Sequence, residues 1–432
     1  MKTKLLIFGI TGDLSTRKLL PAIKHIIEAE DSGELEIIGV SRREVAISDV
    51  LQSSLGSTDL LGKFSLFTMN VALKEDYMRL REFIALKDDE QLLIYLSVPP
   101  QAATQIVDFL GEAKINMPNV KLLFEKPFGV DLVSAEEMIT RTARYFEESQ
   151  LYRIDHYLAK EMAQNIVALR GGNALFEYIW QASAIEKIEI VALESINIES
   201  RAQFYEQTGA LRDFVQGHLM QLLALTLMDI PHNFDWSELP ALRLEALKKI
   251  QPARPEDAVR AQYEGYENEV DNIGSRTETF VSVQLASSDE RWKKVPIQLV
   301  TGKALHEKKT EIRIHLRKFH EAQSNCITLR IQPNEGVEVE LFTKKPGYDR
   351  EFETQRLHYT YTGDTRLPDA YEHVLIDAIR SRKSLFASGE EILESWRILQ
   401  PLQQAWASDD SDLFNYSIGE SVEGLLQKIG RN

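Results

Sequence analysis

Apolar runs alternate with helix-like stretches along the first 150 residues. Five short apolar runs predict buried strands, at residues 4–8, 35–40, 64–69, 92–96 and 120–124. The stretches between them predict helices, at residues 19–29, 74–86, 102–113 and 134–147. Near-continuous apolar strands that alternate with helices are typical of a parallel, doubly wound sheet. We therefore expect residues 1–150 to form a Rossmann-like domain.

The pattern changes beyond residue 150. Residues 152–172, 208–229 and 369–404 predict helices, whereas residues 231–262, polar and proline-containing, predict an irregular or peripheral segment. We predict strands at residues 185–194, 280–285, 297–300, 311–316, 327–331 and 337–341. Many of them alternate apolar and polar positions. Runs of strands with few helices between them favour a mainly antiparallel sheet with helices on one face. The expected fold class is α/β plus α+β, with a larger second domain over residues 151–432.

Length, charge and cysteine content narrow the class of protein. A chain of 432 residues predicts two or three domains. No run of about 18 apolar residues predicts a transmembrane helix. The net charge of −16 argues against nucleic-acid and membrane partners. The single cysteine, Cys326, rules out an internal disulfide and favours a reducing, cytoplasmic location.

The segment FGITGDLSTRK follows the first predicted strand and opens a helix. Gly9 and Gly12 permit a tight turn, and the free N–H groups of the helix would suit a pyrophosphate. The spacing is G-x-x-G, so an ordinary glycine turn is the alternative. After the second strand, Arg42 and Arg43 stand where NAD-specific domains usually have an acid. An arginine there favours the 2′-phosphate of NADP, unless both are ordinary surface arginines.

Two further predicted strands end in prolines, in YLSVPP and EKPFG. The carboxyl ends of strands in open parallel sheets border the ligand crevice. Lys126 lies at this edge, where a cation could touch substrate or cofactor. The alternative is an exposed Glu125–Lys126 pair without a ligand.

Ordered motifs across almost the whole chain resemble the glucose-6-phosphate dehydrogenase family. They are FGITGDLSTRKLLPAI, EKPFGVDL, YRIDHYLAKEMAQNI, TGALRDFVQGHLMQLL, RWKKVPIQLVTGKALHEKKTEIRI, ITLRIQPNEG and DAYEHVLIDAIRS. The resemblance implies oxidation of glucose 6-phosphate at C1 to 6-phosphoglucono-δ-lactone, the first step of the oxidative pentose phosphate pathway. It implies NADP as cofactor, with NAD as the other candidate. It also implies a homodimer or homotetramer.

The same resemblance implies a role for each matching residue. His218 of RDFVQGHL matches the general base, and Asp155 matches the carboxylate that orients it. An imidazole has an unperturbed pKa near 6.5, which suits a base at neutral pH, and the chemistry requires no metal. Substrate contacts are implied for His156, Tyr157, Lys160, Glu194, Asp213, Lys303, Lys308 and Lys126. Cofactor contacts are implied for Gly9, Thr11, Gly12, Asp13, Leu14, Arg42, Tyr95, Ser97 and Lys126.

The spacing of His156 and Lys160 adds one structural expectation. They are four residues apart, so on a helix they would share the face that grips one phosphate. A lone histidine in an apolar run such as the one around His218 would otherwise be a core residue.

The chain departs from the family pattern at a few positions. Ala159 replaces a glycine, Gly217 an asparagine, and Ala202–Gln203 a glycine pair. None is a proposed catalytic residue, but they leave substrate strictness open. The alternatives are a dehydrogenase of another sugar phosphate or of a free sugar, and a non-catalytic binding homologue. Retention of Asp155 and His218 argues against the last.

Overall fold

The computed structural model describes residues 2–29, 33–318, 325–361, 366–408 and 412–430. The chain forms two compact units. Unit 1 comprises Met1–Ala159, Asp235–Pro240 and Pro368–Leu393, and unit 2 comprises Lys160–Phe234, Ala241–Leu367 and Glu394–Asn432. The division drawn from the sequence, 1–150 and 151–432, lies close to the first limit of unit 1 but omits the two later segments. Within the described part of the chain, no helix is long and apolar enough to cross a bilayer.

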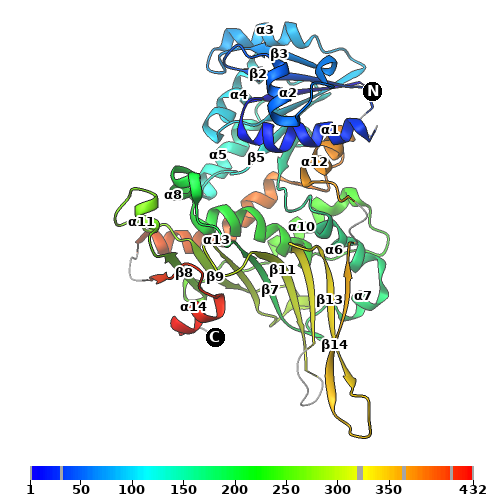
Figure 1. Cartoon of the computed structure of the whole chain (residues 1–432), viewed down its shortest axis with the longest axis vertical. Helices are drawn as coiled ribbons and strands as arrows, with labels where there is room; N and C mark the ends of the chain where they lie inside the picture. Colours follow the sequence, from blue (N-terminus) through cyan, green and yellow to red (C-terminus); the bar gives the residue numbers. More distant parts are fainter. Residues whose placement is uncertain (1, 30–32, 319–324, 362–365, 409–411, 431–432) are drawn as a thin grey trace. The chain divides into compact units, whose positions relative to one another are not determined.

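Unit 1 contains a seven-stranded sheet in the order β15-β6-β5-β4-β1-β2-β3 (Figure 1). Strands β1 to β6 are parallel to one another, as expected, and β15 runs antiparallel to β6. The strands are β1 (Lys2–Phe8), β2 (Leu35–Ser41), β3 (Phe64–Thr68), β4 (Glu90–Leu96), β5 (Val120–Glu125), β6 (Leu151–Ile154) and β15 (Phe386–Ala387). The helices between them are α1 (Leu20–Glu28), α2 (Ile47–Leu55), α3 (Lys74–Ile84), α4 (Pro100–Glu112) and α5 (Leu132–Thr142).

A late segment of the chain completes unit 1. Helix α12 (Ala370–Ile379) and strand β15 contribute Tyr371, Val374 and Phe386 to the same core as β1 and α1. The Nζ of the buried Lys121 donates to the carbonyl of Ala378 at the end of α12. A cation at a helix C-terminus interacts favourably with the helix dipole. Helix α12 is therefore an integral part of unit 1, although it comes late in the chain.

Unit 2 contains a nine-stranded sheet in the order β14-β13-β12-β11-β7-β10-β9-β8-β16. Only the pairs β7 with β10 and β8 with β16 are parallel, so the expected antiparallel character is confirmed. The strands are β7 (Ile185–Leu193), β8 (Ala258–Tyr263), β9 (Phe280–Leu285), β10 (Ile297–Gly302), β11 (Lys309–Leu316), β12 (Cys326–Gln332), β13 (Gly336–Lys344), β14 (Phe352–Thr360) and β16 (Leu413–Tyr416).

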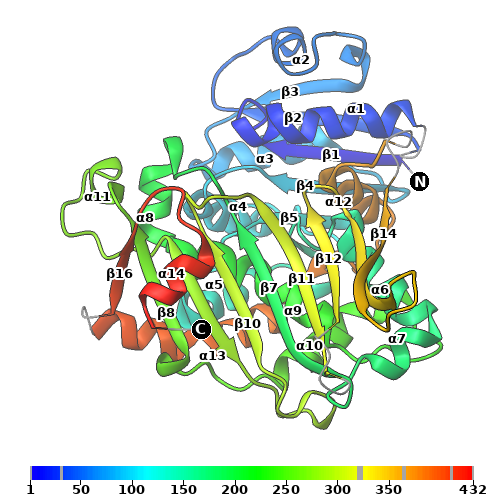
Figure 2. The same cartoon turned by 60° about the horizontal axis from the view of Figure 1, so that its bottom comes forward.

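Helices cover one face of this sheet, and Figure 2 shows its strands in front of α6 and α9. The helical elements are α6 (Glu161–Gly172), α7 (Ala174–Ile179), α8 (Ala202–Ala210), the π-helix η5 (Leu211–Leu219), α9 (Met220–Leu227), α10 (Leu239–Lys248), α11 (Tyr266–Glu269), α13 (Gly389–Ser408) and α14 (Val422–Lys428). Helix α14 lies in front of the strands in Figure 2, on the opposite face from α9. Helices α10 and α13 begin within segments of unit 1. Every residue of α9 is buried, as expected for a helix beneath a sheet.

Two expectations from the sequence are wrong. Residues 152–160 are not helical, because residues 151–154 continue the parallel sheet as β6 beside β5 and a turn follows. Residues 231–262 are not mainly irregular, because they include α10 and most of β8. Arg260 and Gln262 are polar, so they interrupt the apolar pattern that would have predicted β8 as a buried strand. They are buried there because Arg260 pairs with Asp412 and Gln262 donates to two backbone carbonyls.

Candidate active site

The glycine turn of unit 1 lies between β1 and the first helix. Gly9 has a φ of 80°, and a Cβ built there would lie 2.2 Å from the carbonyl oxygen of Ser97. Any side chain would collide with this backbone, so the turn requires glycine. Thr11 and Asp13 are exposed, whereas Gly12 and Leu14 are partly buried. The turn thus precedes a helical segment with its N-terminus accessible, as a dinucleotide site needs.

Ser97 connects this turn to the end of β4. Its N–H donates to the carbonyl of Phe8, and its Oγ lies 3.0 Å from the Oγ of Ser15. Arg42, at the end of β2, is exposed. Tyr95 lies within β4, and Lys126 follows β5. The predicted residues Gly9, Arg42 and Ser97 follow β1, β2 and β4, the adjacent strands around the point where the strand order reverses. That reversal is where ligands of open α/β sheets bind.

Glu125, at the end of β5, is not among the residues for which we predict a role in the site. The buried Tyr95 of β4 donates its hydroxyl to Glu125 Oε1 at 2.5 Å. Burial raises the pKa of Glu125 to about 7, partly opposed by the Tyr95 hydrogen bond and by Lys126. Apolar neighbours such as Leu96, Phe124 and Pro127 line a small hollow beside it. Its place in EKPFG was the available signal, because Glu125 ends a strand and ligands of open parallel sheets bind at the carboxyl ends of strands.

A turn, not a helix, carries Asp155, His156 and Tyr157. The Tyr157 N–H donates to Asp155 Oδ1 at 2.9 Å, and the Leu158 N–H donates to the Asp155 carbonyl. Asp155 is 2% exposed, and His156 stacks on Tyr371 with ring centroids 6.3 Å apart. An aspartate that accepts the N–H two residues on is a standard turn former. The expected helical pairing of His156 with Lys160 is therefore wrong, since Lys160 instead precedes α6 as its N-cap residue.

The remaining predicted residues lie in unit 2, on a helix and on sheet ends. Asp213 and His218 belong to η5 and are 5% and 1% exposed. They are five residues apart. In an α-helix the i,i+3 and i,i+4 positions share a face, whereas the i,i+5 hydrogen bonding of a π-helix brings residues five apart onto one face. The π geometry therefore places Asp213 and His218 on the same side of η5.

The far end of this continuous helix is held by buried side chains. Its last carbonyls, at Leu225, Thr226, Leu227 and the C-cap residue Met228, all accept side-chain hydrogen bonds. Arg170 donates to Leu225 and Met228 at 2.6 Å, Trp180 to Thr226 at 2.8 Å and Trp292 to Leu227 at 2.9 Å. Such carbonyls have no partner inside the helix, so these donors satisfy them.

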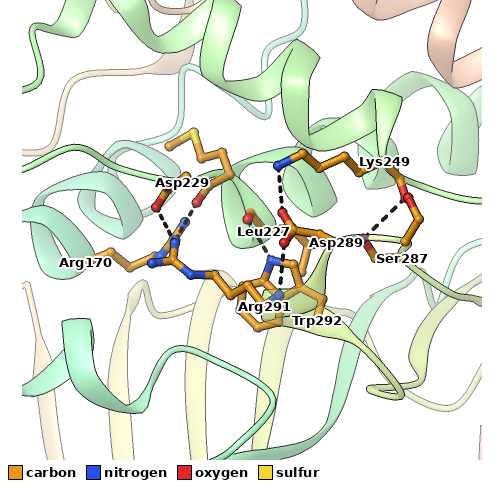
Figure 3. A network of polar contacts seen from close by, with 10 residues as sticks. Arg170, Leu227, Asp229, Lys249, Ser287, Asp289, Arg291 and Trp292 are labelled. Atoms are coloured by element: carbon orange, nitrogen blue, oxygen red, sulfur yellow. Dashed lines mark hydrogen bonds and ion pairs between the residues drawn. The ribbon is translucent and has the colours of Figure 1, made fainter.

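Ion pairs fix the turn that supplies Trp292 (Figure 3). Arg291 pairs with Asp229, just beyond the helix end, and Lys249 pairs with Asp289 at 2.8 Å. The Arg291 N–H also donates to Asp289. The C-terminal end of the helix that carries His218 is thus fixed by the loop between β9 and β10.

Lys303 and Glu194 form a pair at the ends of neighbouring strands. Lys303 Nζ lies 2.5 Å from Glu194 Oε2, and the lysine side chain is 5% exposed. The Lys303 ammonium also lies over the ring of Tyr205, 5.2 Å from its centroid. The pair joins the residue after β7 to the residue after β10, two parallel strands. Lys308, by contrast, is exposed in the loop before β11.

The open parallel sheet with a glycine turn and a reversal of strand order defines unit 1 as a dinucleotide-binding unit of the Rossmann class. Two family models match the chain. Residues 6–165 match "Glucose-6-phosphate dehydrogenase, NAD binding domain", and residues 167–427 match "Glucose-6-phosphate dehydrogenase, C-terminal domain". The chain belongs to the glucose-6-phosphate dehydrogenase family. It is accordingly an oxidoreductase with a domain for a nicotinamide cofactor.

Individual relatives agree over nearly the full length. The chain is 34% identical to glucose-6-phosphate 1-dehydrogenase of Chlamydia muridarum, over 99% of this chain and 96% of the relative. It is 32% identical to the enzyme of the same name from Borreliella burgdorferi, over 98% and 96%. A solved glucose-6-phosphate dehydrogenase in complex with glucose 6-phosphate has 30% identity and a TM-score of 0.90, covering 99% of this chain and 97% of that one.

We expect the stability of the protein to depend on pH through Glu125. Its pKa in the folded state is raised above the usual value near 4.5, so the folded state binds more protons than the unfolded state between about pH 4.5 and 7. Stability should fall as pH rises through this window, by on the order of 1–3 kcal/mol. Urea unfolding at several pH values should show a shallower fall for Glu125→Gln. An unchanged slope would contradict the raised pKa.

Trp292→Phe should lower the free energy of unfolding by about 1–3 kcal/mol, because the buried Leu227 carbonyl loses its donor. Urea unfolding of the variant measures the loss. The matched control is Tyr178→Phe, an aromatic change in the same unit at a side chain that is 73% exposed. It should shift stability by less than about 0.5 kcal/mol. Equal midpoints for the two variants would show that the indole N–H does not stabilise the helix end.

Proposed function

We propose that the protein oxidises glucose 6-phosphate at C1 with NADP and releases 6-phosphoglucono-δ-lactone. The observation that carries the proposal is His218, a 1% exposed histidine that shares one face of a π-helix with the buried carboxylate Asp213. Family membership supports its reading as a general base rather than a core residue. Relatives that carry the name of this activity align over nearly the whole chain.

In the proposed reaction, a ring nitrogen of His218 takes the proton of the C1 hydroxyl as the C1–H bond breaks. When bound at the glycine turn, the oxidised cofactor would supply the acceptor for the hydride that leaves C1. C1 and its oxygen would then form the lactone carbonyl, so the substrate loses a hydride to the nicotinamide and a proton to His218. Asp155 would hold the imidazole in the required tautomer and stabilise its protonated form. Its burial supports this role, because a charge-assisted hydrogen bond is strong away from water.

We assign the remaining residues to substrate binding and cofactor selectivity. His156, Tyr157 and Lys160 would bind the phosphate. Lys160 would act from the N-terminus of α6, where free N–H groups also favour an anion. Asp213, together with the pair Lys303–Glu194, would bind sugar hydroxyls, Lys308 would add an outer contact, and Lys126 would reach both sugar and nicotinamide. Arg42 would bind the 2′-phosphate of NADP.

We also propose a homo-oligomer in the cytoplasm. The face of the large sheet on which α14 lies has a hollow of about 520 Å³, lined by Val191, Val259 and Val300 together with polar and charged residues. A sheet surface of mixed apolar and polar character suits contact with a second copy.

A substrate panel tests the activity. The purified protein should produce NADPH absorbance with glucose 6-phosphate, and slower turnover with other sugar phosphates and free glucose. Both cofactors should be compared with each sugar. Absence of turnover with glucose 6-phosphate between about pH 6 and 9, where a histidine base titrates, would reject the proposal. Faster turnover of another sugar phosphate would redirect it to that substrate.

His218→Asn should lower kcat by about 10²–10⁴ and leave KM for glucose 6-phosphate nearly unchanged, because only the proton transfer is lost. Steady-state kinetics at saturating NADP measure both constants. His232→Asn is the matched control, since His232 belongs to the same unit and its side chain is 81% exposed. If His218→Asn acted mainly on KM, the residue would be a binding group and not the base.

Arg42→Ala should reduce the preference for NADP over NAD by about tenfold or more, since a hydrogen bond to a charged group contributes roughly 1.5–3 kcal/mol. The ratio of kcat/KM for the two cofactors measures this preference. Arg43→Ala is the control, because Arg43 is the exposed neighbour on the same turn. A larger change of the ratio in Arg43→Ala would transfer the role to Arg43.

A further inference from the structure

The helix that carries His218 begins at a sharp break in the backbone. Gly209, the second-last residue of α8, has φ 62° and ψ −179°, a non-helical conformation that kinks the backbone just before η5. Such positive φ values favour glycine. A Cβ added to Gly209 would lie 2.5 Å from Glu278 Oε1. The break and Glu278 are therefore in direct contact.

Glu278 binds the first two N–H groups after this break. Its carbonyl oxygen accepts the N–H of Ala210 at 2.9 Å, and its Oε1 accepts the N–H of Leu211 at 2.9 Å. The residue is 5% exposed, and burial raises the pKa of its carboxyl group while the Leu211 N–H opposes the rise. The first N–H groups of a helix lack partners within the helix. Glu278 supplies two of these partners from a separate part of the chain.

The segment around Glu278 is itself held in place. Thr277 Oγ1 donates to the backbone carbonyl of Glu206, and Gln262 Nε2 donates to the carbonyls of Ser275 and Thr277. On the other side, the Thr279 N–H donates to the carbonyl of Ala261 in β8. Glu278 thus reaches the helix from an anchored position at the start of β9. It defines where the first turn of η5 can lie.

The helix from Leu211 to Leu227 is consequently fixed at both ends. Glu278 holds the N-terminal end, while Trp292 and the other donors hold the C-terminal carbonyls. A helix between two fixed ends cannot change its winding without breaking a hydrogen bond at one of them. We infer that Glu278 is a positioning residue that keeps η5 in its π conformation and thereby keeps His218 aligned with Asp213. The inference rests on the proposed role of His218 as the base.

The test compares Glu278→Ala with Glu278→Gln. The alanine variant loses the Oε1 acceptor and should lower kcat roughly ten- to a hundredfold, as small misplacements of reacting groups do. KM for glucose 6-phosphate should change less than about threefold, because the phosphate ligands lie outside this helix. Glutamine keeps an acceptor oxygen, so Glu278→Gln should retain kcat within about threefold of the unsubstituted protein. Equal losses in both variants would overturn the inference.

Two further variants separate positioning from general stability. Glu206→Ala removes the contacts of a carboxylate with Tyr266, Asn272 and Ser275 without touching the start of η5. It should lower Tm but leave kcat per folded protein unchanged; a loss of kcat as large as in Glu278→Ala would overturn the inference. Gly209→Ala keeps Glu278 and displaces its carboxylate, so it should lower kcat by a similar factor. Its effect should be less than additive with that of Glu278→Ala.

Gly209→Ala tests the same inference if Glu278→Ala does not fold. A kcat equal to that of the unsubstituted protein in a folded Gly209→Ala variant would overturn the inference. His218→Asn, measured in the same assay, distinguishes a wrong assignment of the base from a wrong positioning role of Glu278. If His218→Asn retains full turnover, the proposed base is wrong. If it loses turnover while Glu278→Ala and Gly209→Ala do not, only the positioning role is wrong.

Discussion

The helix Leu211–Leu227 depends on hydrogen bonds that it cannot make for itself, and the arrangement of unit 2 follows from supplying them. Each of its last carbonyls lies among apolar side chains, where an unpaired polar group is costly. Arg170, Trp180 and Trp292 come from three different elements, and each has a polar group at the end of a large apolar body. They satisfy the helix and fill the core at the same time. The sheet and helices are thus fixed relative to the same few carbonyls.

Unit 1 solves a related problem at the ends of its parallel strands. There, backbone must approach closely for a dinucleotide to bind, and Gly9 provides that approach at the cost of conformational freedom. Glu125 at the end of β5 is partly buried beside apolar residues and Tyr95, and this burial raises its pKa to about 7. A group with such a pKa, close to a ligand edge, responds to the charge of whatever binds beside it.

The sequence predicted the elements whose residues are buried on both faces. Strands β1, β2, β4 and β5 lie within two residues of their expected limits, because continuous apolar runs leave little choice. It missed β8, whose Arg260 and Gln262 are buried through partners distant in sequence, and β14, whose side chains are largely exposed. The error at residues 152–160 arose because a short apolar run fits either periodicity.

The candidate site divides in the same way. Motifs located Gly9, Asp155 and His218, since the residue types themselves carry the chemistry. Residue spacing predicts shared faces only if the type of helix is known. The prediction for His156 and Lys160 assumed an α-helix that is not formed. The spacing of Asp213 and His218 did not indicate a π-helix. That geometry requires anchors at both ends of the helix. Glu278 and Trp292 are sixty or more positions away from the helix ends that they bind, beyond the reach of a periodic pattern.

The second passage of the chain through unit 1 has a consequence for biosynthesis. The sheet strands β1 to β6 leave the ribosome early, but their core lacks Tyr371, Val374 and Phe386 until α12 and β15 have been made. Domains made of one continuous segment can fold as they emerge. Here the core of the nascent unit 1 stays incomplete, with apolar surface exposed, until most of unit 2 has been synthesised. Its final closure and that of the larger unit therefore fall in the same late interval of translation.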